Sequence, residues 1–166
     1  MENQRHLKLN KVYFYSVLLL MLVFPAISIL ADYIHQPGIP FVALTGKWFI
    51  FWAIGVRLFT AGIRQVAKPL FTLTEIFHIQ NSESQVIVRE LGFANSCFGV
   101  TGILAMFIAT WQPAAGFIGG LYMGIAGIYH IVKKPAGANE IVAMVSDLFI
   151  FLVMVVYLGW YFIYQT

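Results

Sequence analysis

The chain has 166 residues, of which 60% are hydrophobic and 10% are charged. Soluble domains carry about 25% charged residues, so a soluble protein of this length would leave much apolar surface in water. The apolar residues stand in long blocks, and a helix needs about 20 of them to cross about 30 Å of hydrocarbon. The net charge of +3 comes from basic residues at block ends, which indicates membrane topology and excludes a nucleic-acid partner.

The first two apolar blocks are predicted to span the membrane over residues 12–31 and 41–67. The first is longer than the apolar part of a signal peptide, and no clean small-residue cleavage site precedes Asp32, so we expect it to be retained. A kink is expected at Pro25. The second span ends before Pro69, because proline cannot continue a helix.

The polar stretch 69–84 is too short to cross a bilayer. Thr72 and Glu75 have capping-box spacing, which predicts a short interfacial helix on the cytoplasmic membrane surface. We expect Ile76, Phe77 and Ile79 to be among its apolar contacts with the membrane.

Three further spans are predicted over residues 85–111, 114–132 and 139–164, with Asn139 capping the last one. Residues 1–166 are therefore expected to form a single domain. The predicted fold is an all-α integral membrane bundle of five transmembrane helices with one short interfacial helix.

Basic residues favour an N-terminus in the cytoplasm. With five spans, the segments on that side carry eight lysines and arginines, whereas Lys47 alone lies outside. This distribution follows the positive-inside rule and places the C-terminus outside. We expect a multi-pass protein of a prokaryotic cell membrane. The inner basic residues are Arg5, Lys8, Lys11, Arg64, Lys68, Arg89, Lys133 and Lys134.

Polar residues inside the spans are the candidate site, because they are costly in lipid and normally face a bundle interior or a cavity. Arg57 and Arg64 are seven residues apart, which puts both on one helix face. A rise of 1.5 Å per residue places Arg57 and Asp147 at similar depths of roughly 12–15 Å, so we predict that they interact, directly or through one water. The candidate ligand-binding residues are Arg57, Arg64, Glu90, Asn95, His130, Glu140 and Asp147.

These polar residues have two interpretations. They can form pairs that hold the bundle together, or they can line a polar pocket that opens to the cytoplasm and holds a ligand head group or passes protons. The sequence shows neither a metal-binding spacing of cysteine and histidine nor a phosphate-binding glycine loop. It assigns no catalytic residue and no cofactor.

Glycines recur at helical spacing in the fourth span, at Gly116, Gly120, Gly124 and Gly127. Glycine lets a neighbouring backbone approach closely. The row predicts helix packing, either within this chain or between copies of it in a homo-oligomer.

Three stretches carry a family resemblance: VRELGFAN from Val88, GLYMGIAGIYH from Gly120 and ANEIVAMVSDLF from Ala138. They resemble a family of small prokaryotic multi-span membrane proteins of uncharacterised function, and more loosely the DoxX-like four-helix proteins. The resemblance covers about residues 45–160. It implies a membrane redox system and a quinone or redox partner. Cys97 is the single cysteine, so the chain has no cysteine pair of its own.

The leading functional hypothesis is a membrane protein whose cytoplasm-facing polar pocket binds a small amphiphile, such as a quinone or a membrane lipid. One alternative is a proton-coupled transporter or channel that uses the same carboxylates. The other is a structural or accessory subunit of a membrane complex.

Overall fold

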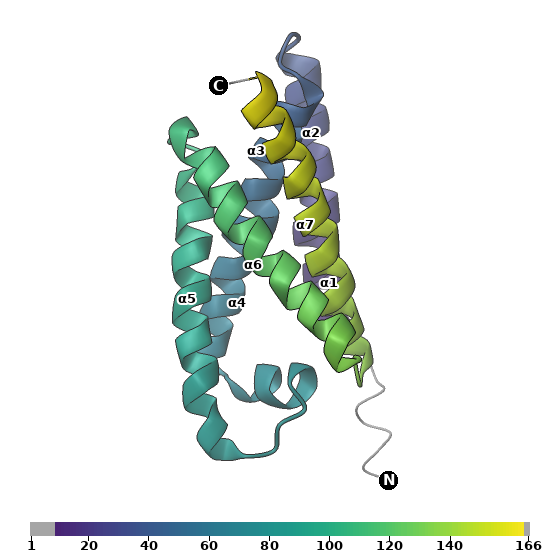
Figure 1. The fold of residues 1–166 in the computed structure, drawn as a ribbon, viewed down its shortest axis with the longest axis vertical. Helices are drawn as coiled ribbons and strands as arrows, with labels where there is room; N and C mark the ends of the chain where they lie inside the picture. The colour runs from purple at the N-terminus through teal and green to yellow at the C-terminus, as the bar shows by residue number, and fades with distance from the viewer. Residues whose placement is uncertain (1–8, 165–166) are drawn as a thin grey trace.

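A computed structural model describes residues 9–164, and within them the chain is helical without a strand (Figure 1). The all-α prediction is confirmed. The basic residues Arg5 and Lys8, which were used to assign the topology, lie outside the described residues.

The first long helix consists of α1 (Lys11–Leu18), a π-helical turn (Leu19–Val23) and α2 (Phe24–His35). The amide of Phe24 donates to the carbonyl of Leu19, one residue further back than in an α-helix. Pro25 follows immediately and has no amide hydrogen, and the helix continues through it after the wider turn. The helix runs past the predicted end at residue 31.

The second long helix consists of α3 (Phe41–Phe49), a π-helical segment (Ile50–Val56) and α4 (Arg57–Ala67), which together match the predicted range. At its start it is tied to the first helix. Lys47 Nζ and Trp48 Nε1 both donate to Asp32 Oδ2, at 2.7 and 2.9 Å.

The segment between the second and third helices differs from its prediction. It contains a short helix, π-helical over Thr72–Ile76, and a 3₁₀ turn (Ser82–Ser84). Thr72 lies inside this helix and no side chain caps its start, so the predicted capping box does not form. Thr72 and Ile76 are buried, and the turn packs against α5 and α7. The prediction that Ile76 faces lipid was therefore wrong, because this side chain completes the inner packing of the bundle.

The remaining helices are α5 (Gln85–Leu104), α6 (Gln112–Lys133) and α7 (Ala138–Tyr164), with a 3₁₀ turn (Ala109–Trp111) before α6. The third predicted span was too long, because α5 ends at Leu104 and not at residue 111. Asn139 does not cap α7 but lies inside its first turn.

Four helical stretches of the described chain, and not the predicted five, are long and apolar enough to cross a membrane. Helix α5 is long enough with 20 residues but is not apolar enough, because Arg89, Glu90 and Asn95 interrupt its apolar run. The qualifying stretches are Lys11–His35, Phe41–Ala67, Ala109–Lys133 and Ala138–Tyr164.

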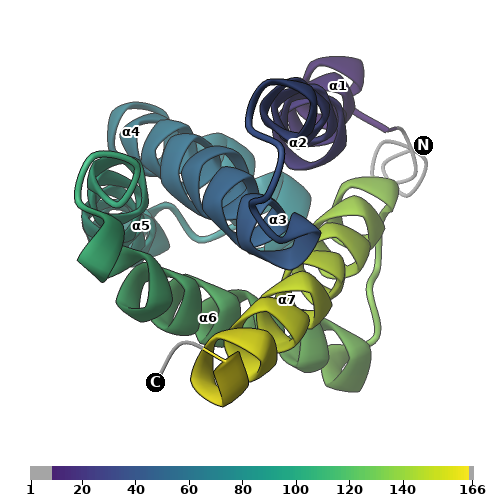
Figure 2. The ribbon, with the colours of Figure 1, turned by 90° about the horizontal axis from the view of Figure 1, so that it is seen from above.

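The second long helix runs through the middle of the bundle (Figure 2). Its α3 part contacts α2 and α7, its π-helical segment contacts α5 and α6, and its α4 part contacts α5. The pair α4–α5 therefore separates from the pair α6–α7 towards the lower end in Figure 1, where the turn Thr72–Ile76 lies between them.

Glycines make both helix pairs close. A side chain at Gly92 would come within 2.9 Å of the carbonyl oxygen of Gly62, so α4 and α5 touch backbone to backbone there. The predicted row on α6 packs within the chain, first against Ile50 of the second long helix and then against Met154, Phe151 and Leu148 of α7. The glycines of that row are Gly116, Gly120, Gly124 and Gly127.

Candidate functional site

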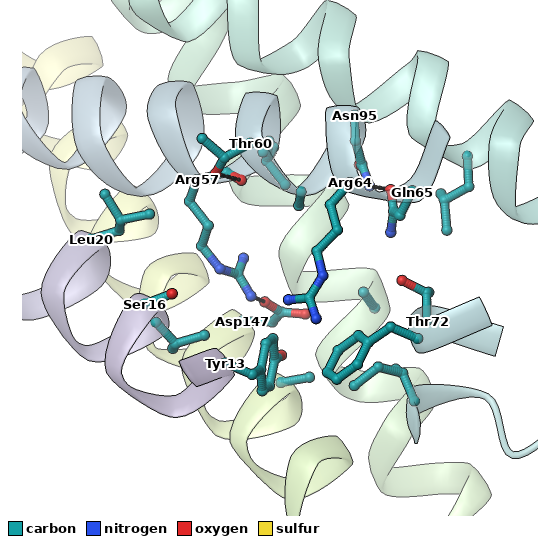
Figure 3. A pocket seen from close by; sticks show the side chains of 18 of the residues that line it. Tyr13, Ser16, Leu20, Arg57, Thr60, Arg64, Gln65, Thr72, Asn95 and Asp147 are labelled. Atoms are coloured by element: carbon teal, nitrogen blue, oxygen red, sulfur yellow. Dashed lines mark hydrogen bonds and ion pairs between the residues drawn. The ribbon is translucent and has the colours of Figure 1, made fainter. Parts of the chain in front are cut away.

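A cavity of about 280 Å³ lies where the two helix pairs separate (Figure 3). Its walls come from α1, α4, α5, α6, α7 and the segment after Pro69. Five of the seven predicted site residues line it, and the other two, Glu90 and Glu140, do not. The five are Arg57, Arg64, Asn95, His130 and Asp147.

The predicted contact between Arg57 and Asp147 is confirmed. Arg57 Nη2 donates to Asp147 Oδ1 at 2.9 Å, and the two side chains are only 13% and 11% exposed. The same nitrogen lies 3.4 Å from Ser146 Oγ. A guanidinium holds its proton at any ordinary pH, so this carboxylate removes the cost of an isolated buried charge.

Local helix geometry aims both arginines into the cavity. The π-helical segment ends at Val56, so Arg57 is the first residue of a regular α-helix. From that point residues three, four and seven positions apart share a face, and Thr60, Ala61 and Arg64 accordingly line the same cavity. A π-helical insertion commonly marks a functional position, and here it sets the direction of Arg57.

Arg64 is held by an aromatic ring. Its guanidinium carbon lies 3.8 Å from the centre of the Phe71 ring, a cation–π contact. The same ring packs against Tyr13 of α1, with centroids 5.6 Å apart. Phe71 therefore links α4 with α1 across the lower part of the cavity.

Asn95 pairs with a residue that the sequence analysis overlooked. Its Nδ2 donates to Gln65 Oε1 at 2.7 Å between α5 and α4. Asn95 Oδ1 is buried and has no hydrogen-bond partner among the described residues. Gln65 follows Arg64 and lies one helical turn beyond Ala61, so its place on the inner face was readable from helical spacing.

Glu140 lies behind the cavity wall. Its side chain is 0% exposed and accepts from His130 Nδ1 and His78 Nε2, each at 3.0 Å. Lys133 Nζ at 3.4 Å and the Ala136 amide at 2.9 Å also donate to it. The prediction that Glu140 lines a pocket was wrong, because its oxygens are used to join the α6–α7 turn to the segment that carries His78.

Glu90 does not face the cavity either. On α5 the inner face is marked by the buried residues Val88, Gly92 and Asn95, and Glu90 lies between them on the opposite, exposed side. The predicted depth of Glu90 was compatible with the pocket, but depth does not determine which way a side chain points.

A second set of contacts holds the turn Thr72–Ile76 in place. Asn139 Nδ2 donates to Glu75 Oε2 at 3.1 Å, and Asn139 Oδ1 accepts from the Asn10 amide at 2.8 Å. These bonds replace the capping role predicted for Asn139. Together with Glu140 they keep the segment across the lower end of the cavity, where Phe71, Thr72, Ile76 and Phe77 line it.

Several lining residues were not predicted, among them Tyr13 on α1 and Tyr122 on α6. Both lie in apolar blocks, where tyrosine gives no distinct signal. Thr72 and Ile76 are four residues apart, and that spacing indicates a shared inner face, which the polar character of the segment obscured.

Comparison of the chain with protein-family models, curated proteins and solved structures finds no match.

Proposed function

We propose that this chain is an integral membrane protein that binds a small amphiphile, such as a quinone or a lipid, in its intramembrane cavity. The observation that carries the proposal is a cavity with one strongly polar wall, formed by Arg57, Arg64 and Asp147, among apolar residues of membrane-length helices. A ligand with a polar head and an apolar body matches such a lining.

The size of the cavity supports an amphiphile over a wholly enclosed ligand. Ligand pockets measure about 300–1,000 Å³, so 280 Å³ holds a head group or a single ring. The rest of a lipophile has to lie outside. The two exposed residues of the lining, Ser16 and Thr60, lie on α1 and α4 and mark the side on which it leaves.

The membrane arrangement that we propose has five spans with the N-terminus in the cytoplasm. Helix α5 crosses with the others because its 20 residues are about 30 Å long and because its polar residue Asn95 is buried, bonded to Gln65 and not exposed to lipid. Basic residues of α1, α4, α5 and α6 stand at one end of the bundle, and the positive-inside rule places that end in the cytoplasm.

Co-purification tests the proposal. Mass spectrometry of the purified chain should identify a bound lipophile. Ala61→Phe should reduce the amount of this lipophile at least about tenfold, because the larger side chain fills the cavity. A tenfold change corresponds to about 1.4 kcal/mol of binding free energy. Ala61 lines the cavity, whereas Ala26 is exposed on α2 outside it, so Ala26→Phe is the matched control. Equal lipophile content in the wild type and both variants would contradict binding in this cavity.

A proton-coupled transporter is the second candidate. The cluster of His130, Glu140 and His78 favours it, because it touches the cavity through His130 and contains groups that exchange protons. Transport predicts a solute flux in liposomes that depends on the pH gradient and is lost in His130→Leu. Flux that is absent at every gradient while a lipophile still co-purifies would reject this candidate.

A further inference from the structure

Arg64 differs from the other arginine of the cavity in what it contacts. Arg57 is neutralised by Asp147 at 2.9 Å. Among residues 9–164, Arg64 forms neither an ion pair nor a hydrogen bond through its guanidinium, and its contact is the face of Phe71 at 3.8 Å. Figure 3 shows the Arg64 side chain extending from α4 into the cavity.

The charge of the lining is unbalanced as a result. Arg57 and Arg64 are cations, and Asp147 is the single carboxylate among the lining residues. Glu140 does not compensate, because its oxygens are occupied by His130, His78, Lys133 and a backbone amide. Within residues 9–164, the lining of the cavity therefore carries one positive charge that is not paired with a carboxylate.

An arginine in this position selects its partner by geometry as well as by charge. The guanidinium carries five donors in a planar fork that matches a carboxylate or a phosphate. The contact with the Phe71 ring restricts the Arg64 side chain, so less conformational entropy is lost when an anion binds. A neutral hydroxyl or ketone would leave the charge uncompensated in a low-dielectric site.

The route of a lipophile is set by what closes the cavity. The turn Thr72–Ile76 covers the lower end and is held there by Asn139 and Glu140. Ser16 and Thr60, the exposed lining residues, lie five and seven positions from the ends of their helices at Lys11 and Ala67. A rise of 1.5 Å per residue puts them roughly 8 and 11 Å inside the helix ends, at the level of acyl chains.

We propose that the ligand is a lipophile with an anionic head group, a carboxylate or a phosphate, that binds Arg64, while its apolar chain leaves between α1 and α4 into the surrounding lipid. The proposal rests on the proposed function, since it names the class of amphiphile that the cavity takes.

Binding to the purified full chain in a non-ionic detergent tests the inference with two pairs of probes. The first pair is oleate and oleyl alcohol, and the second is dioleoyl phosphatidic acid and dioleoylglycerol. Each probe is titrated into the protein, and its affinity is obtained from the rise in unfolding temperature with probe concentration. The anionic member of at least one pair should bind the wild type about tenfold more tightly or better, as expected for charged hydrogen bonds. Preference for oleate identifies a carboxylate lipophile, and preference for phosphatidic acid identifies a phospholipid head group.

Variants assign the preference to one residue. Arg64→Gln should remove the preference for the anion, and a cooperative thermal unfolding transition without ligand shows that the variant is folded. Arg64→Lys keeps the charge without the fork and should retain part of the preference. The control is Arg89→Gln, because Arg89 is exposed on α5 and does not line the cavity.

The outcomes separate the two proposals. If neutral and anionic probes bind the wild type equally, or if Arg64→Gln keeps the anion preference, the inference is wrong while amphiphile binding stands. If no probe binds and no lipophile co-purifies with the wild type, the proposed function fails as well.

Discussion

The ion pair between Arg57 and Asp147 joins two helices and also forms part of the cavity wall. Both side chains are nearly buried, and both line the cavity. Each partner alone would be an uncompensated charge among apolar helices, which is strongly destabilising. The pair is joined through Asp147 Oδ1 alone, with Ser146 as a further neighbour of the guanidinium. The cavity therefore keeps a polar wall that needs no ligand to be stable.

A double-mutant cycle tests this pair. Arg57→Met and Asp147→Leu should each lower the free energy of unfolding by about 3 kcal/mol or more, because each leaves the other charge buried and alone. The double variant should lose less than the sum of the two. Thermal unfolding in detergent measures the four proteins. A control cycle pairs Arg57→Met with Lys47→Met. Lys47 contacts Asp32 at the other end of the bundle, so the two losses of stability should be additive. Additive losses for Arg57 and Asp147 would show that the contact has no energetic role.

The contact between α4 and α5 depends on backbone proximity. At Gly99 an added Cβ would overlap the backbone nitrogen of Phe59, an atom that cannot move without its helix. Gly62 of α4 and Gly92 of α5 also approach each other closely. Gly62 lies one turn beyond Phe59 on α4, and Gly92 lies two turns from Gly99 on α5. Small residues of this kind let helices associate in a membrane, where lipid removes most of the hydrophobic driving force. The packing also positions Asn95 to reach Gln65.

A single methyl group should therefore separate these helices. Gly99→Ala is expected to reduce the free energy of unfolding by about 1–3 kcal/mol, the usual cost of overpacking. Gly159→Ala is the matched control, since nothing lies within 4 Å of a Cβ at that position of α7. There alanine should be neutral or slightly stabilising, because it favours a helix over glycine. Thermal unfolding in detergent compares them, and equal stability of the two variants would contradict the close-packed interface.

The sequence predicted those elements that follow from the local pattern of apolar and polar residues alone. Long apolar blocks between prolines indicate helices, and the seven-residue spacing of Arg57 and Arg64 placed both on one face of the cavity. The segment after Pro69 does not follow from that pattern, because its inward packing is fixed by distant partners such as Asn139. Glu90 and Glu140 were judged by depth, and only the tertiary arrangement shows that one faces outwards and the other is used for internal hydrogen bonds.

At the scale of the whole molecule, the cavity results from the course of the central helix. Its upper part packs with α2 and α7 and its lower part with α5, so the two helix pairs move apart where Arg57 and Arg64 are located. The first helix closes one side of the gap and is tied to the bundle through Asp32 and Lys47 at 2.7 Å. It is therefore part of the site, since Tyr13 and Ser16 line the cavity.

This arrangement makes a prediction about topology. Residues at the start of α1 and at the end of α7 lie at opposite ends of the bundle (Figure 1), which is compatible with the five crossings that we propose. A reporter fused after Thr166 should therefore read as outside, and one inserted near Gly137, in the turn between α6 and α7, as cytoplasmic. Lys133 and Lys134 next to that turn favour the cytoplasmic side, because translocating them is unfavourable. The measurement is a pair of fusions active on opposite sides, such as alkaline phosphatase and a cytoplasmic fluorescent protein. Equal signals at the two positions would mean that α7 does not cross, and a reversed pattern would place the basic end, with its cavity, on the outer face.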